Sequence, residues 1–504
     1  MAMTQLDQAK VGRPPEGAGP PAAELWRAPR AADIAARLDR RTVSQPVLSG
    51  LVRGADAFLA VVIGTAAAVA THAPLPPLAL LPLGGAPLAL LLFAQAADGY
   101  EVGALGRFAR GFGIAAAAWT ALFVIFVVAL ALLAPGDSEW RSWFGAWYVA
   151  GLGGLAVLRA ALALLVRRWT AAGRLERRAI LVGGGTAAAE LIERLEATPE
   201  NDVRIWGVFD DRGDERSPPV VAGYPKLGTV AELVDFARRA KIDMLLITLP
   251  LTAERRVQEI LKQLWVLPVD IRLAAHTDKL GFRSRGSRLG TVPVVNVADR
   301  PIADWNALTK RGFDLAVGSL ALLALSPLMA LVALAIKLDT PGPVLFRQKR
   351  WGFNNEVIGV FKFRSMHHAQ RDEAAKKAVT RGDPRVTRVG RFIRKTSIDE
   401  LPQLFNVVRG ELSLVGPRPH ALHSNTNDQT WEQVVDGYFA RHRVKPGVTG
   451  WAQINGWRGE VDDPEKLRQR VAHDLYYIEN WSILFDVLIL LKTPLALAKA
   501  ENAF

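Results

Sequence analysis

Four long apolar stretches in the first third of the chain constrain its fold more than any other feature. A bilayer core about 30 Å thick requires roughly 20 apolar residues in helical form. Four stretches meet this length: Leu51–His72, Pro76–Ala97, Phe112–Ala134 and Phe144–Val166. The sequence therefore predicts a membrane protein in which residues 46–168 form a four-helix transmembrane bundle. A buried helical core is the alternative, but four runs of this length rarely arise in a soluble protein.

Connections rich in basic residues alternate with connections that have few or none along these stretches. The turn Ala73–Pro77 carries no charge, and the connection Pro135–Trp143 has a single basic residue. The other flanks are basic: Arg37, Arg40, Arg41 and Arg53 around the first start, Arg107 and Arg110 in the second connection, and Arg167, Arg168, Arg174, Arg177 and Arg178 after the fourth stretch. Because Lys and Arg favour cytoplasmic connections, we expect both ends of the bundle in the cytoplasm.

Net charge and cysteine content limit the classes of ligand that the chain is expected to bind. The formal net charge is +13, which favours nucleic acid, anionic lipid or phosphorylated substrates. Together with the apolar stretches, it makes lipid and phosphorylated substrates the expected partners, and no nucleic acid. The absence of cysteine excludes disulfides, thiolate metal sites and cysteine nucleophiles. Residues 1–45 are polar and rich in Pro, Ala and Arg, so we expect a disordered tail without a signal peptide.

After the bundle, residues 175–298 alternate between short apolar runs and helical patterns. The predicted strands are Ala179–Val182, Arg204–Phe209 and Met244–Leu249, with helices at Glu190–Glu196 and Ala231–Ala240. Such alternation is typical of a doubly wound sheet with parallel strands, and it predicts a Rossmann-like α/β domain.

The first of these strands is followed by a glycine-rich turn. Gly183, Gly185 and Ala188 occupy the marked positions of the pattern G-x-G-x-x-G/A. One interpretation is a nucleotide phosphate held by backbone N–H groups at a helix N-terminus. The other is a tight turn without a ligand. Asp210 lies 27 residues beyond Gly183, later than the roughly 20 expected for a ribose-binding acid, so a regulatory or assembly role is favoured.

A fifth apolar run, residues 313–338, is long enough to cross a membrane, yet both of its flanks are basic. Ser326 and Pro327 lie near its middle, where proline removes a helix hydrogen bond and a serine hydroxyl can satisfy the freed carbonyl. The run therefore reads either as a helix that enters one leaflet and returns, or as an ordinary span kinked at Pro327. Residues 301–400 hold 17 Lys and Arg against 9 Asp and Glu. Loops this basic are poorly suited to export, which favours the re-entrant interpretation.

Several motifs follow this run in a fixed order. They are Phe361-Lys362-Phe363-Arg364, Asp383-Pro384-Arg385, Thr396-Ser397-Ile398-Asp399-Glu400 and Gly416-Pro417-Arg418-Pro419. Together with Ser326-Pro327, these motifs resemble the catalytic domain of the bacterial monotopic polyprenyl-phosphate hexose-1-phosphate transferases, over residues 305–504. The four spans and the Rossmann-like domain resemble the large members of that family, such as the undecaprenyl-phosphate glucose and galactose phosphotransferases.

The resemblance implies a small α/β catalytic domain and a two-step transfer. Asp399 corresponds to the family's nucleophile, which attacks the β-phosphate of a nucleotide-sugar, and polyprenyl phosphate then attacks the phosphosugar-aspartyl intermediate. Splitting a transfer in this way is typical of nucleophilic catalysis. Adjacent carboxylates beside a diphosphate suggest Mg²⁺ as the cofactor, with Asp399 and Glu400 as its ligands. A competing interpretation is that Ser397 and Glu400 form a helix capping box.

Other polar residues are expected to bind substrate phosphates. Developing charge on a phosphoryl group is stabilised by preorganised cations and donors. The candidates are Arg364, Arg385, Arg391, Arg394 and Arg418, and the resemblance adds Gln453, which lies in a segment similar to one that the family places near the donor. Arg418 lies between two prolines, which suits a rigid bidentate contact. An arginine that caps a helix is the alternative for Arg418.

By resemblance, the donor is UDP-glucose first and UDP-galactose second, and the acceptor is undecaprenyl phosphate. The expected product starts exopolysaccharide or O-antigen assembly at the cytoplasmic face of the bacterial inner membrane. The resemblance to the large members also implies a homodimer. The rivals from other classes are a membrane-anchored nucleotide-sugar oxidoreductase that uses the glycine-rich turn, and a non-enzymatic scaffold for polysaccharide export.

Overall fold

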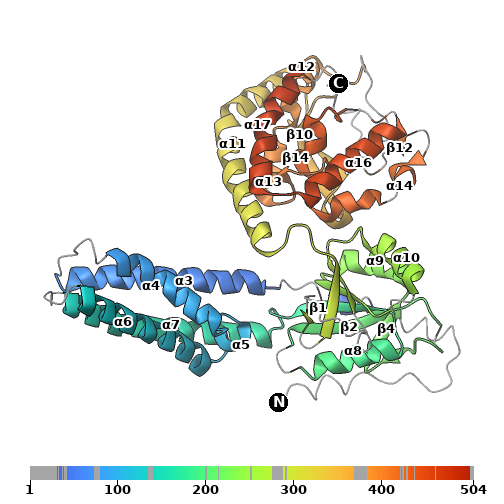
Figure 1. The fold of residues 1–504 in the computed structure, drawn as a ribbon. Helices are drawn as coiled ribbons and strands as arrows, with labels where there is room; N and C mark the ends of the chain where they lie inside the picture. The colour runs from blue at the N-terminus through green and yellow to red at the C-terminus, as the bar shows by residue number, and fades with distance from the viewer. Residues whose placement is uncertain are drawn as a thin grey trace. The chain divides into compact units, whose positions relative to one another are not determined.

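A computed structural model describes residues 42–72, 80–133, 140–198, 201–213, 215–249, 253–274, 288–289, 292–367, 383–420 and most of 425–499, with a few residues between 31 and 38. The chain divides into two compact units. Figure 1 draws the helices of the first unit in blue and teal. One unit comprises residues 40–177. The other comprises residues 178–504 and the segment before residue 40.

The first unit is a bundle of long apolar helices. It contains α3 (Gln45–Ala70), α4 (Leu80–Ala96), the short α5 (Val102–Leu105), α6 (Phe108–Leu133) and α7 (Trp140–Ala171). Ser44 caps α3 by accepting from the Val47 N–H at 3.3 Å, and Pro46 lies in its first turn, where a missing N–H costs nothing.

Four of the described helices are long and apolar enough to cross a membrane. They are Gln45–Ala70, Phe108–Ala129, Arg141–Ala171 and Asp304–Asp339. The first three match the first, third and fourth predicted spans. The second predicted span is represented by α4, which has 17 described residues and is shorter, and the start of that prediction lies outside the described residues. The fourth candidate is the helix for which we predicted re-entry.

Tryptophans and glycines fix the packing of the bundle. The indole N–H groups of Trp143 and Trp147 donate to the carbonyls of Gly64 and Ala60, at 2.8 and 3.0 Å. A β-carbon at Gly64 would lie 2.6 Å from the Trp147 ring, so only glycine permits this close approach. Small residues therefore let α3 and α7 pack closely, as is common in membrane helix pairs.

A buried ion pair joins the same two helices. Asp56 and Arg159 are 0 and 1 % exposed, and the Arg159 guanidinium donates to both Asp56 oxygens at 3.1 and 2.7 Å. The Tyr100 hydroxyl donates to the same carboxylate at 2.9 Å. The sequence analysis did not identify this pair.

The second unit begins with an eight-stranded sheet in the order β3-β4-β2-β1-β5-β6-β8-β7. Its strands are β1 (Arg177–Val182), β2 (Val203–Phe209), β3 (Val220–Val221), β4 (Tyr224–Gly228), β5 (Met244–Ile247), β6 (Asp270–Ala274), β7 (Arg288–Leu289) and β8 (Val292–Ala298). The pairs β1–β5, β5–β6 and β2–β4 are parallel. This confirms the predicted α/β sheet rich in parallel strands.

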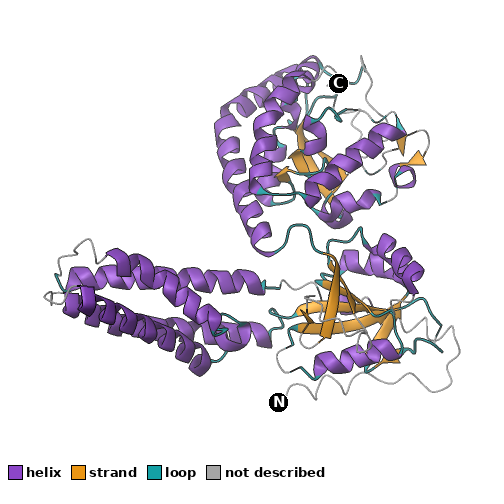
Figure 2. Ribbon diagram, in the orientation of Figure 1, coloured by secondary structure: helices purple, strands orange, loops and turns teal. Residues whose placement is uncertain are grey.

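Helices cover both faces of this sheet (Figure 2). Alternate residues of β1 point to opposite sides: Ile180 and Val182 pack with α9 (Val230–Arg239) and α10 (Glu254–Leu264), whereas Ala179 and Leu181 pack with α8 (Thr186–Glu196). Leu38 is fully buried in the first of these cores. The predicted disordered tail, residues 1–45, is therefore folded at this position.

The described part of the C-terminal domain contains three two-stranded sheets among helices, one of which is the short antiparallel pair β12 (Asn425–Thr426) and β13 (Gln429–Thr430). An antiparallel hairpin pairs β9 (Leu345–Trp351) with β10 (Val357–Phe363), and β11 (Ser413–Val415) pairs in parallel with β14 (Gly447–Thr449). The larger helices are α11 (Asp304–Asp339), α12 (Arg388–Lys395), α16 (Pro464–Glu479) and α17 (Ile483–Lys499), with α13 (Gln403–Arg409) next to the acid pair. A core that includes Val360, Val407, Val415 and Tyr477 lies between them.

Helix α11 continues through the predicted break. The Ser326 hydroxyl donates to the Leu323 carbonyl at 2.7 Å. Leu323 is four residues before Pro327, so this is the carbonyl that the missing proline N–H leaves without its helical partner. The serine thus satisfies the backbone group that the proline frees, as the sequence predicted.

Candidate active site

The acid pair lies on a short, unusual turn between two helices. Ser397 adopts φ 58°, and Ile398–Glu400 then form a single 3₁₀ turn before α13. A non-glycine residue in the left-handed region is strained, and such strain concentrates at functional sites. The Ser397 side chain makes no capping bond to this turn and instead accepts from Arg458 at 2.8 Å. The capping-box interpretation is therefore not realised.

Glu400 is clamped by two cations from distant parts of the chain. Lys362, on β10, donates to Glu400 Oε1 at 2.9 Å, and Arg418 donates to Oε1 and Oε2 at 2.5 and 3.1 Å. All three side chains are largely buried, at 13 to 21 % exposed. Burial alone would raise the pKa of Glu400, but Arg418 and Lys362 outweigh it and hold that pKa well below its usual range. Glu400 is therefore ionised and fixed in place.

Asp399 has a different environment on the same turn. Burial raises the pKa of the Asp399 carboxyl, and the charges of Lys362, Arg394 and Arg418 offset this only in part. Glu400 next to it raises the pKa further. No hydrogen bond to the Asp399 side chain occurs among the described residues. One carboxylate of the pair is thus held as an anchor, and the other is left available to react.

The predicted phosphate-binding residues fall into two groups. Arg418 and Arg394 lie beside the acid pair. Arg364 does not, because it donates to the carbonyls of Ile336, Thr340 and Pro341 and so caps the end of α11.

The remaining predicted phosphate-binding residues are Arg385, Arg391 and Gln453. Arg385 is bonded to Asp383 at 2.6 and 3.0 Å, and Arg391 is exposed on α12. Gln453 Oε1 is buried and has no hydrogen-bond partner among the described residues, which leaves an acceptor for a substrate donor group.

Sequence reasoning missed three cations at this site. Lys362 contacts Glu400 directly, Arg458 contacts Ser397, and Arg350 lies close enough to Arg418 and Glu400 for its pKa to respond to both. Burial, with the repulsion of Arg418, lowers the pKa of Arg350 to about 10. The sequence did contain one signal for Lys362. It belongs to the motif Phe361-Lys362-Phe363-Arg364, from which only Arg364 was chosen as a phosphate-binding candidate.

The site therefore carries more positive than negative charge. Among the described residues, five cations act on two carboxylates: Arg350, Lys362, Arg394, Arg418 and Arg458 face Asp399 and Glu400. The Glu400 contact uses one N–H from each terminal nitrogen of Arg418, whereas a guanidinium offers five donors in all. The arrangement suits an anionic ligand such as a diphosphate.

The residues of this site fit Mg²⁺ only in part. No cluster of three or more His, Asp or Glu side chains that could hold a metal occurs in the described part of the chain. Both Glu400 oxygens are already bonded to cations, so Glu400 would have to exchange a partner to bind a metal. Asp399 is the carboxylate with bonding capacity left. Mg²⁺ is commonly held by one or two carboxylates together with substrate phosphates, which this arrangement permits.

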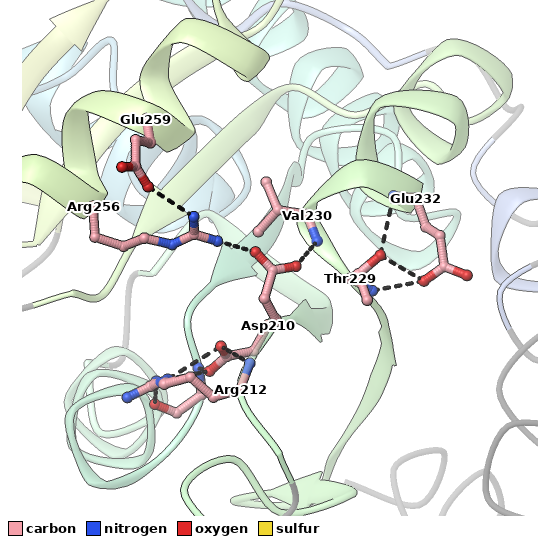
Figure 3. Close-up of polar contacts among 9 residues, drawn as sticks. Asp210, Arg212, Thr229, Val230, Glu232, Arg256 and Glu259 are labelled. Atoms are coloured by element: carbon pink, nitrogen blue, oxygen red, sulfur yellow. Dashed lines mark hydrogen bonds and ion pairs between the residues drawn. The ribbon is translucent and has the colours of Figure 1, made fainter. Parts of the chain in front are cut away.

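The glycine-rich turn of the α/β domain is occupied by the chain itself (Figure 3). The Gly184 N–H donates to Asp210 at 2.5 Å, and Arg212 donates to both Asp210 and the Gly184 carbonyl, each at 2.7 Å. Gly183 and Gly185 have φ of 102 and 88°, which a tight turn requires. Asp210 thus reaches the turn despite its late position in the sequence.

The neighbouring acid is also paired within the domain. Asp211 accepts from the Val230 N–H at 2.8 Å and from Arg256. Arg256 also bonds to Glu259 at 3.0 Å, and Figure 3 labels this pair. A capping box of Thr229 and Glu232 begins α9 beside it. Both acids after β2 therefore join elements of this domain to one another.

Comparison with known proteins finds two family matches. Residues 305–500 match the bacterial sugar transferase family, and residues 95–275 match a family described as a CoA-binding domain. An undecaprenyl-phosphate glucose phosphotransferase of Komagataeibacter xylinus is 44 % identical over 66 % of this chain and 61 % of the relative. The chain thus spans less than two thirds of that relative.

Two further relatives are covered more fully. UDP-glucose:undecaprenyl-phosphate glucose-1-phosphate transferases of Escherichia coli K12 and Xanthomonas campestris are 39 and 33 % identical over 77 % of this chain. The matches cover 82 and 80 % of those proteins. With a matched catalytic domain and relatives aligned along most of its length, the chain belongs to the bacterial sugar transferase family.

Proposed function

We propose that this protein transfers glucose 1-phosphate from UDP-glucose to undecaprenyl phosphate and releases UMP. The observation that carries the proposal is the unequal acid pair, in which Glu400 is clamped by Lys362 and Arg418 while Asp399 forms no side-chain hydrogen bond with any residue that the structure describes. The names of the aligned relatives support glucose as the sugar. UDP-galactose is the alternative donor for the same site.

In the first step, an oxygen of Asp399 attacks the β-phosphorus of UDP-glucose. A bond forms between that oxygen and phosphorus, and the bond from phosphorus to the bridging oxygen breaks. The bridging oxygen leaves with UMP, and glucose 1-phosphate stays on the aspartyl group. A buried carboxylate with a raised pKa is a stronger nucleophile than a solvated one, provided that it is ionised.

In the second step, a phosphate oxygen of undecaprenyl phosphate attacks the same phosphorus. The bond to Asp399 breaks, the carboxylate is regenerated, and the product is undecaprenyl diphosphate-glucose. A water-soluble donor and a lipid acceptor thus use one site in turn. The cations around the pair stabilise the phosphoryl charge in both steps.

The proposal includes Mg²⁺ as a cofactor that neutralises phosphate charge when bound. Asp399 would hold it together with donor phosphates, while Glu400 keeps Lys362 and Arg418 in position. Arg418 retains N–H groups beyond its Glu400 contact, and these can face the diphosphate. The chain's own cations thus orient the donor whether or not Glu400 gives up a partner.

We further propose that the catalytic domain lies on the cytoplasmic face of the inner membrane, with α11 re-entrant. Both halves of α11 pack on this one domain. Near its start, Asp314 accepts from the Ser413 hydroxyl at 3.0 Å, and at its end Asp339 accepts from the Val389 N–H at 3.2 Å. A helix that crossed the bilayer would carry its two ends to opposite sides, away from a shared partner. Leu323 and Leu331, 72 and 65 % exposed, supply an apolar outer surface for lipid.

Purified protein incubated with radiolabelled UDP-glucose and Mg²⁺ tests the proposal. Without acceptor, we expect UMP release limited to one equivalent of enzyme and label bound to the protein. Added undecaprenyl phosphate should transfer that label to lipid and allow continued turnover. Asp399→Asn should lose the bound label, while Glu465→Gln, which changes an exposed acid on α16, should retain it.

Two results would contradict this mechanism. One is steady UMP release by Asp399→Asn. The other is label transfer that requires UDP-glucose and the lipid to be present together, because a covalent intermediate allows the two to be added in succession.

A further inference from the structure

We propose that Arg441 and Arg350 are positioning residues that hold the backbone of the Pro417–Pro419 segment, so that Arg418 meets Glu400 and the donor. This inference rests on the proposed function, because it assigns a role at that same site. Neither residue touches the acid pair through a hydrogen bond of its own. Arg441 acts through the carbonyl of Arg418, and Arg350 acts through the carbonyl of the next residue, Pro419.

The segment that carries Arg418 is held through its carbonyl groups. Proline has no backbone N–H, so Pro417 and Pro419 can be fixed only as acceptors. The four successive carbonyls from Pro417 to His420 all accept a hydrogen bond: from the Gly447 N–H at 2.9 Å, Arg441 at 2.9 Å, Arg350 at 2.5 Å and the Trp351 N–H at 3.1 Å. The two central bonds come from arginine side chains.

Arg441 is itself fixed from several directions. It is fully buried, and the nitrogen that donates to the Arg418 carbonyl also lies 2.6 Å from the Asp474 carboxylate. Its other terminal nitrogen lies 3.0 Å from His420 Nε2 and 3.3 Å from the Tyr438 hydroxyl. The chain of contacts runs from α16, which carries Asp474, through Arg441 to the backbone of Arg418.

Arg350 forms the second support from the hairpin. Its Nε and one terminal nitrogen donate to Gln348 Oε1 at 3.1 and 2.8 Å, which leaves the other terminal nitrogen aimed at the Pro419 carbonyl. Gln348 lies two residues away on the same strand, so the two side chains share one face of β9. The arginine fork is thereby oriented before any substrate arrives.

Arginine is required by this geometry. A guanidinium is a planar fork whose nitrogens serve several acceptors at once, whereas a lysine ammonium is a single point on a flexible stem. Lysine at position 441 would keep a positive charge beside Asp474 but could not span Asp474, His420 and the Arg418 carbonyl together. Arg441→Lys therefore removes the support while it preserves the charge that folding requires.

A double-mutant cycle on the full-length protein separates positioning from a general structural role. Arg441→Lys should weaken UDP-glucose binding and slow UMP release, each by about tenfold, because small misplacements of a binding group are costly. In an Arg418→Ala background, where no side chain remains to be positioned, the same change should cost less than about twofold. Arg468→Lys is the matched control, since it alters an exposed pair with Glu465 on the same helix as Asp474.

Equal losses with and without Arg418 would overturn the proposal, as would unchanged binding in a folded Arg441→Lys protein. If thermal melting shows that Arg441→Lys does not fold, the same cycle with Arg350→Lys decides the question by the same criteria. Binding constants need no turnover. A wild-type protein that binds UDP-glucose without releasing UMP would therefore refute the proposed function and still allow the positioning test.

Discussion

The glycine-rich turn and the acid pair both place two adjacent carboxylates beside a sharp turn, but their charges are balanced differently. After β2, Asp210 bonds to Arg212 and Asp211 bonds to Arg256, so each acid has a cation from the same domain. At the other turn, five cations face Asp399 and Glu400. A region whose charges satisfy one another holds a fold together, whereas an excess of one sign calls for a ligand of the opposite sign.

The largest expected effect comes from breaking the clamp at the acid pair. Glu400→Gln keeps the shape of the side chain but removes the charge that binds Lys362 and Arg418. We expect the kcat/KM for UDP-glucose to fall by about 100-fold, because preorganised charge is a large part of phosphoryl-transfer catalysis. Steady-state UMP release measures the change.

Glu259→Gln supplies the matched control from the α/β domain. This change breaks a carboxylate contact with Arg256, at 3.0 Å, in a more exposed pair far from the acid pair in the sequence. It should leave kcat/KM within about twofold of wild type. Equal losses in the two variants would show that the contrast between the regions has no catalytic meaning.

A smaller effect is expected from Lys362→Met, and it depends on pH. Burial raises the pKa of Asp399, and Lys362 is the largest influence that lowers it. The nucleophile must be ionised, so activity is present above this pKa and is lost as the pH falls through it. Removing Lys362 raises the pKa further, and the acid limb of the profile should move to higher pH. We expect about a tenfold loss at pH 8 and a larger loss at pH 6. An acid limb that stays in place would contradict this assignment.

Asp210→Asn should affect stability and leave catalysis intact. Burial raises the pKa of Asp210, but its bonds to Arg212 and Gly184 outweigh this and lower it overall. A carboxyl whose pKa is lower in the folded protein than in the unfolded protein stabilises the fold at pH values above its unfolded pKa, which is near 4. This contribution is lost as the pH falls through the pKa of the folded protein. We expect the variant to lose about 2 kcal/mol in its free energy of unfolding at neutral pH. Denaturant titration measures this loss, with exposed Asp235→Asn as the control.

The smallest effect is expected at the break in α11. Ser326→Ala removes the donor to the Leu323 carbonyl and should cost about 1 kcal/mol, while Ser319→Ala on the same helix should cost less. A reporter fused after residue 504 should lie in the cytoplasm in wild type. A periplasmic reporter would contradict re-entry and, with it, the proposed site of the reaction.

Local patterns were enough to predict most of the architecture. The length of the apolar stretches predicted three of the spans, and the alternation of strand and helix patterns predicted the parallel sheet. Both patterns could be read because they depend on residues that are neighbours in the sequence. The Ser326–Pro327 pair could be interpreted for the same reason, since the hydroxyl and the freed carbonyl are separated by three residues. Re-entry and the roles of Asp399 and Glu400 remain predictions.

Contacts between distant residues could not be predicted in this way. Lys362 and Glu400 are 38 residues apart, and Asp56 and Arg159 are 103 apart, so no local period links them. Arg364 was assigned to the substrate because it is basic and belongs to one of the motifs of this domain, but it follows the end of β10 and turns to α11. The capping box failed because Ser397 adopts a left-handed conformation that its sequence does not announce.

The Asp56–Arg159 pair has a consequence for how this protein is made. An unpaired charge is costly in hydrocarbon, and here the two charges belong to the first and the last helix of the bundle. During synthesis, Asp56 emerges from the ribosome long before its partner exists. The early helix therefore needs a temporary polar environment at the insertion machinery, and a chain truncated before α7 should be recognised as defective and degraded.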